Sequence, residues 1–452
     1  MLLIRNAVLI PVAGEAEAIV DGWMLVDGDR IHSLGSGEPP AVDAEVLDVG
    51  GAFVAPGFVS AHSHLFTSPT RGLGADRTLY GWCDSMLGFF AHVDPELMYW
   101  CTMHGSLDFL ANGVTTAFDF TDPRLPWEPM VDGRRADGGG RLKPIEYTLR
   151  QMDAKADAGL RAVNAIPMDA TIGTDDEILA RFAAAVEHAA SLDARLALGA
   201  AVFGAVQWSP REDAAELEVE AMRRFGVGNQ AHFLETREAV ETQRAKFAHY
   251  ERAGALGLGL VFGHFIQTTP EIIERAAAGG AGMSWQPASN GRLASGVADI
   301  PAIRAAGMPI GVGLDDQACT DVADPWQNMR IGIYQLRALT GDPEVMSPAE
   351  MLRLHTLGSA EILGVADRVG SLEPGKFADF VVVDPRSPDL GPLWHPVASY
   401  VLACSLRNLK QVYVGGELVA RDGVAVSPLA AEASARVHEA LPRLAAEVGH
   451  PA

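Results

Sequence analysis

Two histidines stand two residues apart at the end of an apolar segment, PGFVSAHSHL. If this segment is a β-strand, its period of two places the side chains of His62 and His64 on the same side. Two neutral imidazoles are costly to bury side by side without a cation, and imidazole is a common ligand of zinc and similar metals. The pair therefore predicts a metal site at the end of a strand.

Further polar residues also end apolar segments. His232 lies in NQAHFLE with Glu235 three residues later, His264 ends LGLVFGH, and Asp315 ends MPIGVGLD. Taken singly, Glu235 could be a charge at a helix N-terminus, and Asp315 a turn or capping residue. Together, histidines and an aspartate at separate strand ends predict a site for Zn²⁺, Fe²⁺ or Co²⁺ with one position open for water.

The segments that must position these residues alternate regularly. From about residue 56 to about residue 364, eight short apolar segments are each followed by a helical or loop pattern. Such alternation predicts a parallel sheet, and eight units close a (β/α)₈ barrel, in which catalytic groups gather at the carboxyl ends of the strands. An open doubly wound sheet is the alternative, but no GxGxxG or P-loop motif follows the first strand. The expected strands are 52–62, 113–120, 159–168, 195–203, 229–235, 258–264, 281–285 and 308–315.

The two ends of the chain have a different texture. Both contain short segments rich in β-branched residues, separated by Gly and Asp turn signals. The simplest architecture is an α/β protein in which residues 1–55 and 365–452 build one small β-sandwich around a TIM-like barrel of residues 56–364. The C-terminal part is expected to end in a helix.

Composition limits the partners and the compartment. The chain has 452 residues, of which 58 are acidic and 35 basic, giving a net charge of −23. Because no run of Lys and Arg appears, we expect neither nucleic acid nor an anionic membrane surface as a partner. No signal peptide and no apolar stretch of about 18 residues is visible. Four cysteines without a CxxC motif fit a reducing compartment, so a cytoplasmic protein is expected.

Several ordered motifs resemble those of the amidohydrolase superfamily, in the branch of cytosine, guanine and adenosine-type deaminases and triazine hydrolases (chlorohydrolases). The resemblance covers nearly the whole chain. It implies a metal-dependent hydrolase built on a (β/α)₈ barrel. The motifs are PGFVSAHSHL, HFLET, GHF, SNGRLASGVADIPAIRAAGMPIGVGLD and GSAEILGVADRVGSLEPGKFADFVVVD.

The resemblance also implies roles for individual residues. Glu235 matches the acid/base that shuttles protons, and His264 matches the histidine beside the metal. Asp315, which is also in a position to take a proton from the nucleophilic water, completes the catalytic set. The residues that match the metal ligands are His62, His64, His232 and Asp315.

The number of metal ions follows from a missing lysine. Relatives with two metals bridge them through a carboxylated lysine on the fourth strand, and the stretch between Lys155 and Lys246 contains no lysine. We therefore expect one divalent ion per chain, in first place Zn²⁺, with Fe²⁺, Co²⁺ or Mn²⁺ as alternatives.

The sequence departs from the deaminases around the expected substrate. The family's SHNP motif reads SWQP here, so Trp285 replaces a histidine, and the region of the HAP(Y/F) motif reads VFGAVQWSP without a histidine. Partners for a polar heterocycle or a ribose are thus missing, and an aromatic residue favours a flatter or more apolar substrate. The residues predicted to bind substrate are Trp82, Phe89, Phe203, Trp285 and Asn290.

The leading hypothesis is hydrolysis of a carbon–nitrogen bond in a small, fairly apolar or heteroaromatic molecule, including xenobiotics, by deamination or by amide or urea cleavage. One alternative is a nucleobase or nucleoside deaminase. Another is a hydrolase of a different leaving group, such as the thiolate of a thiocarbamate or the chloride of a triazine. A non-catalytic relative is disfavoured because all the metal ligands are kept. Since relatives are mostly dimers or tetramers, a homo-oligomer is expected.

Overall fold

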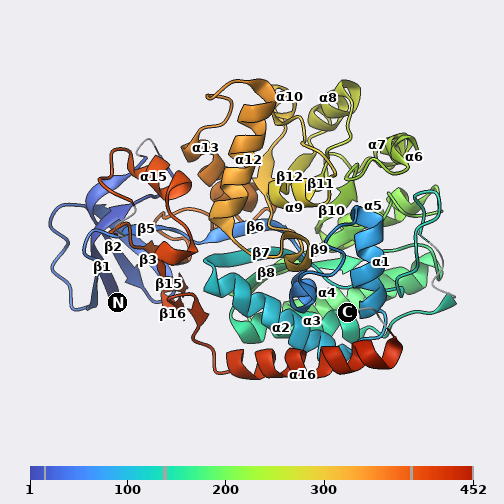
Figure 1. The fold of residues 1–452 in the computed structure, drawn as a ribbon, viewed down its shortest axis with the longest axis horizontal. Helices are drawn as coiled ribbons and strands as arrows, with labels where there is room; N and C mark the ends of the chain where they lie inside the picture. The colour runs from blue at the N-terminus through green and yellow to red at the C-terminus, as the bar shows by residue number, and fades with distance from the viewer. Residues whose placement is uncertain (15–16, 136–139, 387–389, 450–452) are drawn as a thin grey trace.

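Eight parallel strands form a barrel at the centre of the molecule (Figure 1). The computed structural model describes residues 1–14, 17–135, 140–386 and 390–449. Neighbouring barrel strands follow one another in chain order, which confirms the predicted α/β barrel. The strands are β6 (Phe58–Ser63), β7 (Val114–Phe120), β8 (Arg161–Pro167), β9 (Ala197–Gly204), β10 (Gly228–Phe233), β11 (Leu260–His264), β12 (Gly282–Trp285) and β13 (Ile310–Val312).

The barrel closes between its first and last strands. Ser63 and Asp315 form a parallel bridge, and the backbone N–H of Asp315 donates to the carbonyl of His62 at 2.9 Å. The Ser60 hydroxyl also accepts from the backbone N–H of Leu314 at 3.0 Å. These contacts bring the end of the first strand against the segment that carries Asp315.

The expected strand 52–62 is divided between two sheets. Its first part is β5 (Phe53–Pro56), which belongs to the sheet outside the barrel, and its second part is β6. Gly57 separates the two. A Cβ at Gly57 would lie 2.2 Å from Oγ1 of Thr115, so only glycine allows the chain to pass this close to β7.

The outer sheet contains strands from both ends of the chain, as predicted. Nine strands form one mixed sheet, and the two ends meet where β5 pairs with β14 through Val54 and Val382. The domain limits themselves stay a prediction. The other strands are β1 (Leu2–Leu9), β2 (Ile19–Asp27), β3 (Arg30–Ser36), β4 (Glu45–Asp48), β14 (Phe380–Val383), β15 (Leu409–Val414), β16 (Glu417–Arg421) and β17 (Val424–Ala425).

Helices surround the barrel, and their ends carry recognisable sequence signals. In α4, for example, Thr174 and Glu177 form a capping box, and Ile178, Phe182 and Ala185 face the core at helical spacing. The longer helices after β6 are α1 (Leu79–Phe90), α2 (Pro95–Ala111), α3 (Glu146–Ala158), α4 (Asp175–Ser191), α5 (Ala214–Phe225), α7 (Phe247–Ala253), α8 (Pro270–Ala278), α12 (Pro325–Thr340), α15 (Pro396–Leu402) and α16 (Ala430–Val448).

Shorter helical segments lie between these elements. They are η1 (Leu65–Thr70), α6 (Val240–Ala245), α9 (Pro287–Arg292), α10 (Ile300–Ala305), α11 (Gln317–Thr320), α13 (Pro348–Arg353), α14 (Ser359–Ile362) and the turns Leu354–Gly358 and Leu406–Asn408.

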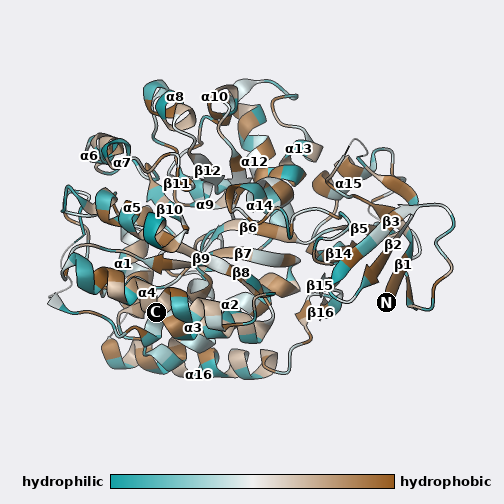
Figure 2. Ribbon diagram, turned by 180° about the vertical axis from the view of Figure 1, so that it is seen from behind, coloured by the Kyte–Doolittle hydropathy of each residue, from teal (hydrophilic) through white to brown (hydrophobic). Residues whose placement is uncertain are grey.

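The C-terminal helix α16 returns to the barrel. It runs beside α2 (Figure 1), with Val437 and Leu441 buried. Hydrophilic and hydrophobic residues alternate along it (Figure 2). This pattern fits a helix that packs one face on the protein and leaves the other exposed. None of the helices within the described residues is long and apolar enough to cross a membrane.

Candidate metal centre and substrate cavity

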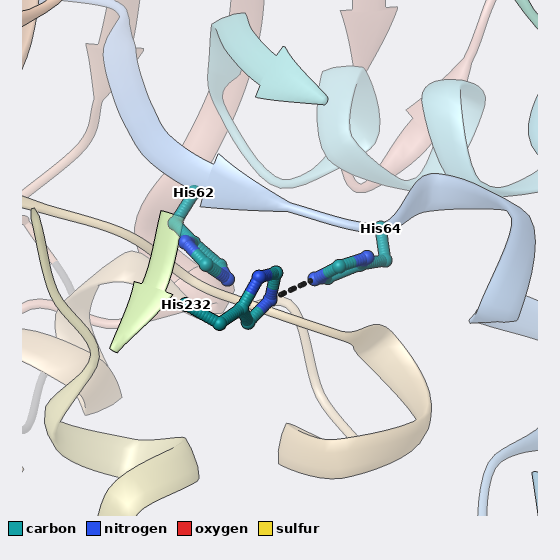
Figure 3. Close-up of side chains that lie close together, drawn as sticks. All are labelled: His62, His64 and His232. Atoms are coloured by element: carbon teal, nitrogen blue, oxygen red, sulfur yellow. Dashed lines mark hydrogen bonds between the residues drawn. The ribbon is translucent and has the colours of Figure 1, made fainter. Parts of the chain in front are cut away.

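The side chains predicted to bind metal meet at the carboxyl ends of the barrel strands. His62 lies on β6 and His64 just after it, His232 lies on β10, His264 ends β11, and Asp315 follows β13. The imidazoles of the first three point toward one another (Figure 3). Because parallel strands end at the same edge of a barrel, residues far apart in sequence become neighbours here.

The ligand atoms of this group lie within a few ångströms. The Nε2 atoms of His64 and His232 are 3.0 Å apart (Figure 3). Oδ1 of Asp315 lies 3.5 Å from Nε2 of His62 and 3.8 Å from Nε2 of His64. Its Oδ2 lies 3.9 Å from Nε2 of His264. All these side chains are buried except that of His64, which is 12% exposed.

The backbone at three of these strand ends is strained. Leu234, His264 and Asp315 have φ angles of 56°, 68° and 63°, in the left-handed region that side chains other than glycine rarely adopt. Such conformations persist where surrounding contacts impose them, and they cluster at functional sites. Because these residues lie directly beside the histidines and acids, the strained backbone fits a site that holds those side chains in place.

Two histidines are oriented by buried amides. Nδ1 of His62 lies 2.5 Å from Oε1 of Gln230, and Gln230 Nε2 donates to the carbonyl of Ala61 at 2.9 Å. Nδ1 of His264 lies 2.9 Å from Oδ1 of Asn290. An amide oxygen only accepts, so in both histidines Nδ1 carries the proton and Nε2 presents a lone pair.

These lone pairs make the group suitable for a metal. Nε2 of His62 and of His264 are buried and have no hydrogen-bond partner among the described residues. An unpartnered buried nitrogen is unfavourable, whereas a cation beside the Asp315 carboxylate would satisfy it. A donor set of imidazole nitrogens and one carboxylate is typical of Zn²⁺ and similar divalent ions. The residues present therefore fit a metal of this kind.

The protonation states agree with this fit. Burial lowers the pKa of His62 and His232 well below the usual value and that of His64 to about 4. Burial opposes ionisation of Asp315, but the neighbouring His62 and His264 outweigh it and lower the pKa of that carboxyl. Neutral imidazoles and an ionised carboxylate are the forms that bind metals.

Glu235 lies beside this group rather than at a helix end. It follows β10, while α6 begins only at Val240, which excludes the interpretation as a charge at a helix N-terminus. Oε2 of Glu235 lies 3.5 Å from Nε2 of His264. Burial raises its pKa to about 7, although His264 opposes the rise and the charge of Asp315 adds to it. A carboxyl with such a pKa can both donate and accept a proton at neutral pH.

The sequence analysis missed Asp316. Its Oδ2 lies 3.8 Å from Nε2 of His64, and its buried Oδ1 has no hydrogen-bond partner among the described residues. Burial and the adjacent Asp315 raise its pKa well above the usual value. The available signal was the change from the family's TDG to LDDQ, which puts a second carboxyl directly after the first.

A cavity opens onto these groups. The candidate metal centre is in its lining, through His64, His232 and Asp315, together with Glu235. The rest of the wall is largely apolar and aromatic. Its main residues are Phe66, Trp82, Met86, Trp127, Phe203 and Trp208.

Only two of the five residues predicted to bind substrate line this cavity. Trp82 and Phe203 do, whereas Phe89 is buried under α16, in the lining of a different hollow. Trp285 is fully buried and packs toward α12, where a Cβ at Gly332 would lie 2.8 Å from its ring. Asn290 lies behind His264 and contacts its imidazole. Trp285 and Phe89 therefore lie outside the lining of this cavity.

Part of the wall comes from residues that the sequence analysis did not single out. The segment between β7 and α3 contributes Trp127, Met130 and Arg135, and the segment after β9 contributes Trp208. The Trp208 ring lies 5.3 Å from that of His232, centre to centre. The altered segment VFGAVQWSP contains Trp208, and this change of motif is the signal that could have placed the residue here.

Comparison with known proteins gives a consistent assignment. Residues 53–419 match the model of the amidohydrolase family. A 5-methylthioadenosine/S-adenosylhomocysteine deaminase of Symbiobacterium thermophilum is 28% identical over 459 residues, covering 99% of both chains. An adenosine deaminase from Xanthomonas campestris with bound zinc has a similar fold, with a TM-score of 0.84, 22% identity and 98% of both chains covered. Atrazine chlorohydrolase from Arthrobacter aurescens, complexed with zinc, gives a TM-score of 0.81 at 20% identity, covering 97% of this chain and 100% of that one.

Proposed function

This chain belongs to the amidohydrolase family and is a metal-dependent hydrolase of carbon–nitrogen bonds, and we propose that it acts on a small, largely apolar or heteroaromatic molecule carrying an amine, amide or urea group. The observation that carries the proposal is the aromatic wall of the cavity directly beside the His/Asp group. Apolar surface buried against such a wall favours binding, whereas a hydroxyl left without a partner there is penalised.

In this proposal His62, His64, His232 and Asp315 hold one divalent cation, in first place Zn²⁺. When bound, the cation acts as a Lewis acid and makes water a nucleophile near neutral pH. The fourth strand, β9, carries no lysine, which supports one ion rather than two. Gln230 keeps His62 in the tautomer that a ligand requires, through its hydrogen bond to Nδ1.

The protein's own acids and bases move the protons. Asp315 is ionised, and its carboxylate can accept a proton from the attacking water. Glu235, with a pKa of about 7, carries the proton to the leaving nitrogen. Nε2 of His264 lies 3.5 Å from Oε2 of Glu235, close enough to receive a proton from it during the reaction, and its Nε2–H would then donate to the oxygen that gains negative charge.

A deaminase of a thioether nucleoside is the second candidate. It is favoured by the relatives that are named 5-methylthioadenosine/S-adenosylhomocysteine deaminases, at 25–28% identity. A methylthio group would suit an apolar wall, but a ribose needs polar partners. Loss of another leaving group, as thiolate or chloride, stays a third alternative, because the same hydrolytic groups would serve it.

A mass-spectrometric screen of the metal-loaded protein tests the proposal, with Glu235→Gln as the blank. The panel contains amides, phenylureas, triazines, thiocarbamates, nucleobases and nucleosides, including 5′-methylthioadenosine. Glu235-dependent cleavage of amides, ureas or heteroaromatic amines supports the proposal. Release of ammonia from nucleosides alone supports the second candidate and contradicts the apolar substrate. Loss of only thiolate or chloride supports the third.

A further inference from the structure

A buried arginine lies in the aromatic part of the cavity wall, away from the candidate metal ligands in the chain. Arg135 is 8% exposed, and its guanidinium carbon lies 5.5 Å from the centre of the Trp208 ring and 6.0 Å from that of Trp127. Its backbone N–H donates to the carbonyl of Trp208 at 2.9 Å. The arginine is therefore fixed at the aromatic side of the cavity. A cation buried in such surroundings needs partners.

Asp169 provides the charge that balances Arg135. Nη1 of Arg135 donates to Oδ2 of Asp169 at 2.7 Å, and both side chains are almost fully buried. The other oxygen of Asp169 accepts from the backbone N–H and the hydroxyl of Thr171 at 2.9 and 2.6 Å. Burial opposes ionisation of Asp169, but Arg135 and Thr171 outweigh it and lower its pKa. The pair is thus a fixed and neutral unit.

The Nε–H donor of Arg135 is left over. Its Nε is buried and has no hydrogen-bond partner in the part of the chain that the structure describes. A buried N–H without an acceptor is unfavourable, and the side chains of the neighbouring Trp127 and Trp208 offer only ring faces and N–H groups. Since none of the described residues supplies the acceptor, Nε can receive one from a molecule that enters the cavity.

We propose that Arg135 binds an uncharged acceptor atom of the substrate, such as a carbonyl oxygen, on the Trp127 and Trp208 side of the cavity. The acceptor is uncharged because Asp169 already neutralises the guanidinium. A carboxylate would bring an unbalanced negative charge into an apolar cavity. The inference rests on the proposed function, in that it adds a second recognition group to the same substrate.

A matched pair of small probes tests the proposal without requiring turnover. Acetophenone and α-methylstyrene have nearly the same shape, but the first has a carbonyl oxygen where the second has a methylene group. Quenching of tryptophan fluorescence reports their binding to the metal-loaded protein, because Trp82, Trp127 and Trp208 line the cavity. The wild type should bind acetophenone about tenfold more tightly, as expected for a hydrogen bond to a charged donor.

Two variants assign the preference to the arginine. Arg135→Met should bind both probes equally. This change leaves Asp169 buried without a counter-charge. The double variant Arg135→Met with Asp169→Asn removes both charges, and it should also lose the preference for acetophenone. The proposal would be overturned if the preference survives in either folded variant. It would also be overturned if the wild type binds both probes equally or does not bind acetophenone. Failure of the proposed function would instead appear as no Glu235-dependent turnover, with the probe preference unaffected.

Discussion

His264 and Asn290 are joined by a buried hydrogen bond of 2.9 Å between the imidazole Nδ1 and the amide Oδ1. Asn290 was expected to touch the substrate, but it lies behind the histidine. Its amide fixes the tautomer and the direction of His264, whose Nε2 faces Glu235 and Asp315. The amide therefore acts on the chemistry through another residue, which makes it a positioning residue.

Asn290→Ala should reduce kcat/KM by about 10- to 100-fold, the usual range for removing such a partner, while the metal content stays the same. The physical reason is that the imidazole would lose its fixed tautomer without losing its place. Kinetics together with metal analysis of the purified variant would check this. Full activity, or loss of metal in parallel with activity, would contradict the positioning role.

The metal centre itself should stabilise the fold. The Nε2 atoms of His64 and His232 are 3.0 Å apart, and Nε2 of His62 has no hydrogen-bond partner among the described residues, so a bound cation relieves an unfavourable arrangement. A free metal concentration 1,000 times the Kd would add about 4 kcal/mol to the free energy of unfolding. Chelation should lower the Tm accordingly, as measured by differential scanning calorimetry, and readdition of Zn²⁺ should restore it.

His232→Ala and Asp315→Ala should abolish both activity and metal binding, because each removes a candidate ligand. Wild-type protein should contain one equivalent of metal per chain, as determined by inductively coupled plasma mass spectrometry. Two equivalents would overturn the single-metal prediction. Retention of metal in both variants would contradict the placement of the metal site at these residues.

Glu235→Gln should keep the metal and lose activity by at least about 10²-fold, the lower range for a general acid or base. The amide has nearly the same shape and can still hydrogen bond, but it cannot carry a proton. Single-turnover kinetics and metal analysis separate the two effects. A variant with wild-type kcat would exclude Glu235 from proton transfer.

The architecture and the residues at the ends of the strands could be predicted from the sequence, because both depend on local patterns. Alternating apolar and helical segments predicted the eight strands, and the polar residues at their ends had to meet at one edge of a barrel. The closeness of His62 to His232 follows from this topology alone. Cytoplasmic location and homo-oligomerisation stay predictions from composition and resemblance.

The cavity wall was less predictable. The direction of Trp285 depends on the space that Gly332 leaves on α12, a contact between distant segments. Likewise, Trp127 and Arg135 belong to a segment without periodicity, whose path is set by the Arg135–Asp169 pair and by hydrogen bonds to the Trp208 loop. The position of a residue in a family motif predicts which part of the fold it occupies, but packing decides whether its side chain faces the cavity.

A buried carboxyl on α5 allows a prediction about stability and pH. Glu218 is 2% exposed and accepts hydrogen bonds from the backbone N–H of Ala205 at 2.7 Å and from Nδ2 of Asn229 at 2.8 Å. Burial raises its pKa from 4.5 to about 7, although these hydrogen bonds oppose the rise. The folded protein therefore holds this proton more tightly than the unfolded chain does.

The sign of the effect follows from proton linkage. Below pH 4.5 Glu218 is protonated in both states, so its stabilising contribution is complete; it is lost as the pH rises from 4.5 through about 7. The side chain in Glu218→Gln cannot ionise. Oδ1 of Asn229 has no partner among the described residues. If the Asn229 side chain flips, this oxygen can accept a hydrogen bond from the new amide. The variant should thus exceed the wild type in free energy of unfolding by up to about 3 kcal/mol at pH 8, and by little at pH 5.

Urea denaturation of both proteins at the two pH values would measure this difference. The exposed Glu220 on the same helix supplies the control, since Glu220→Gln should leave the pH dependence unchanged. Parallel pH profiles of Glu218→Gln and the wild type would mean that the carboxyl ionises without cost in the folded protein.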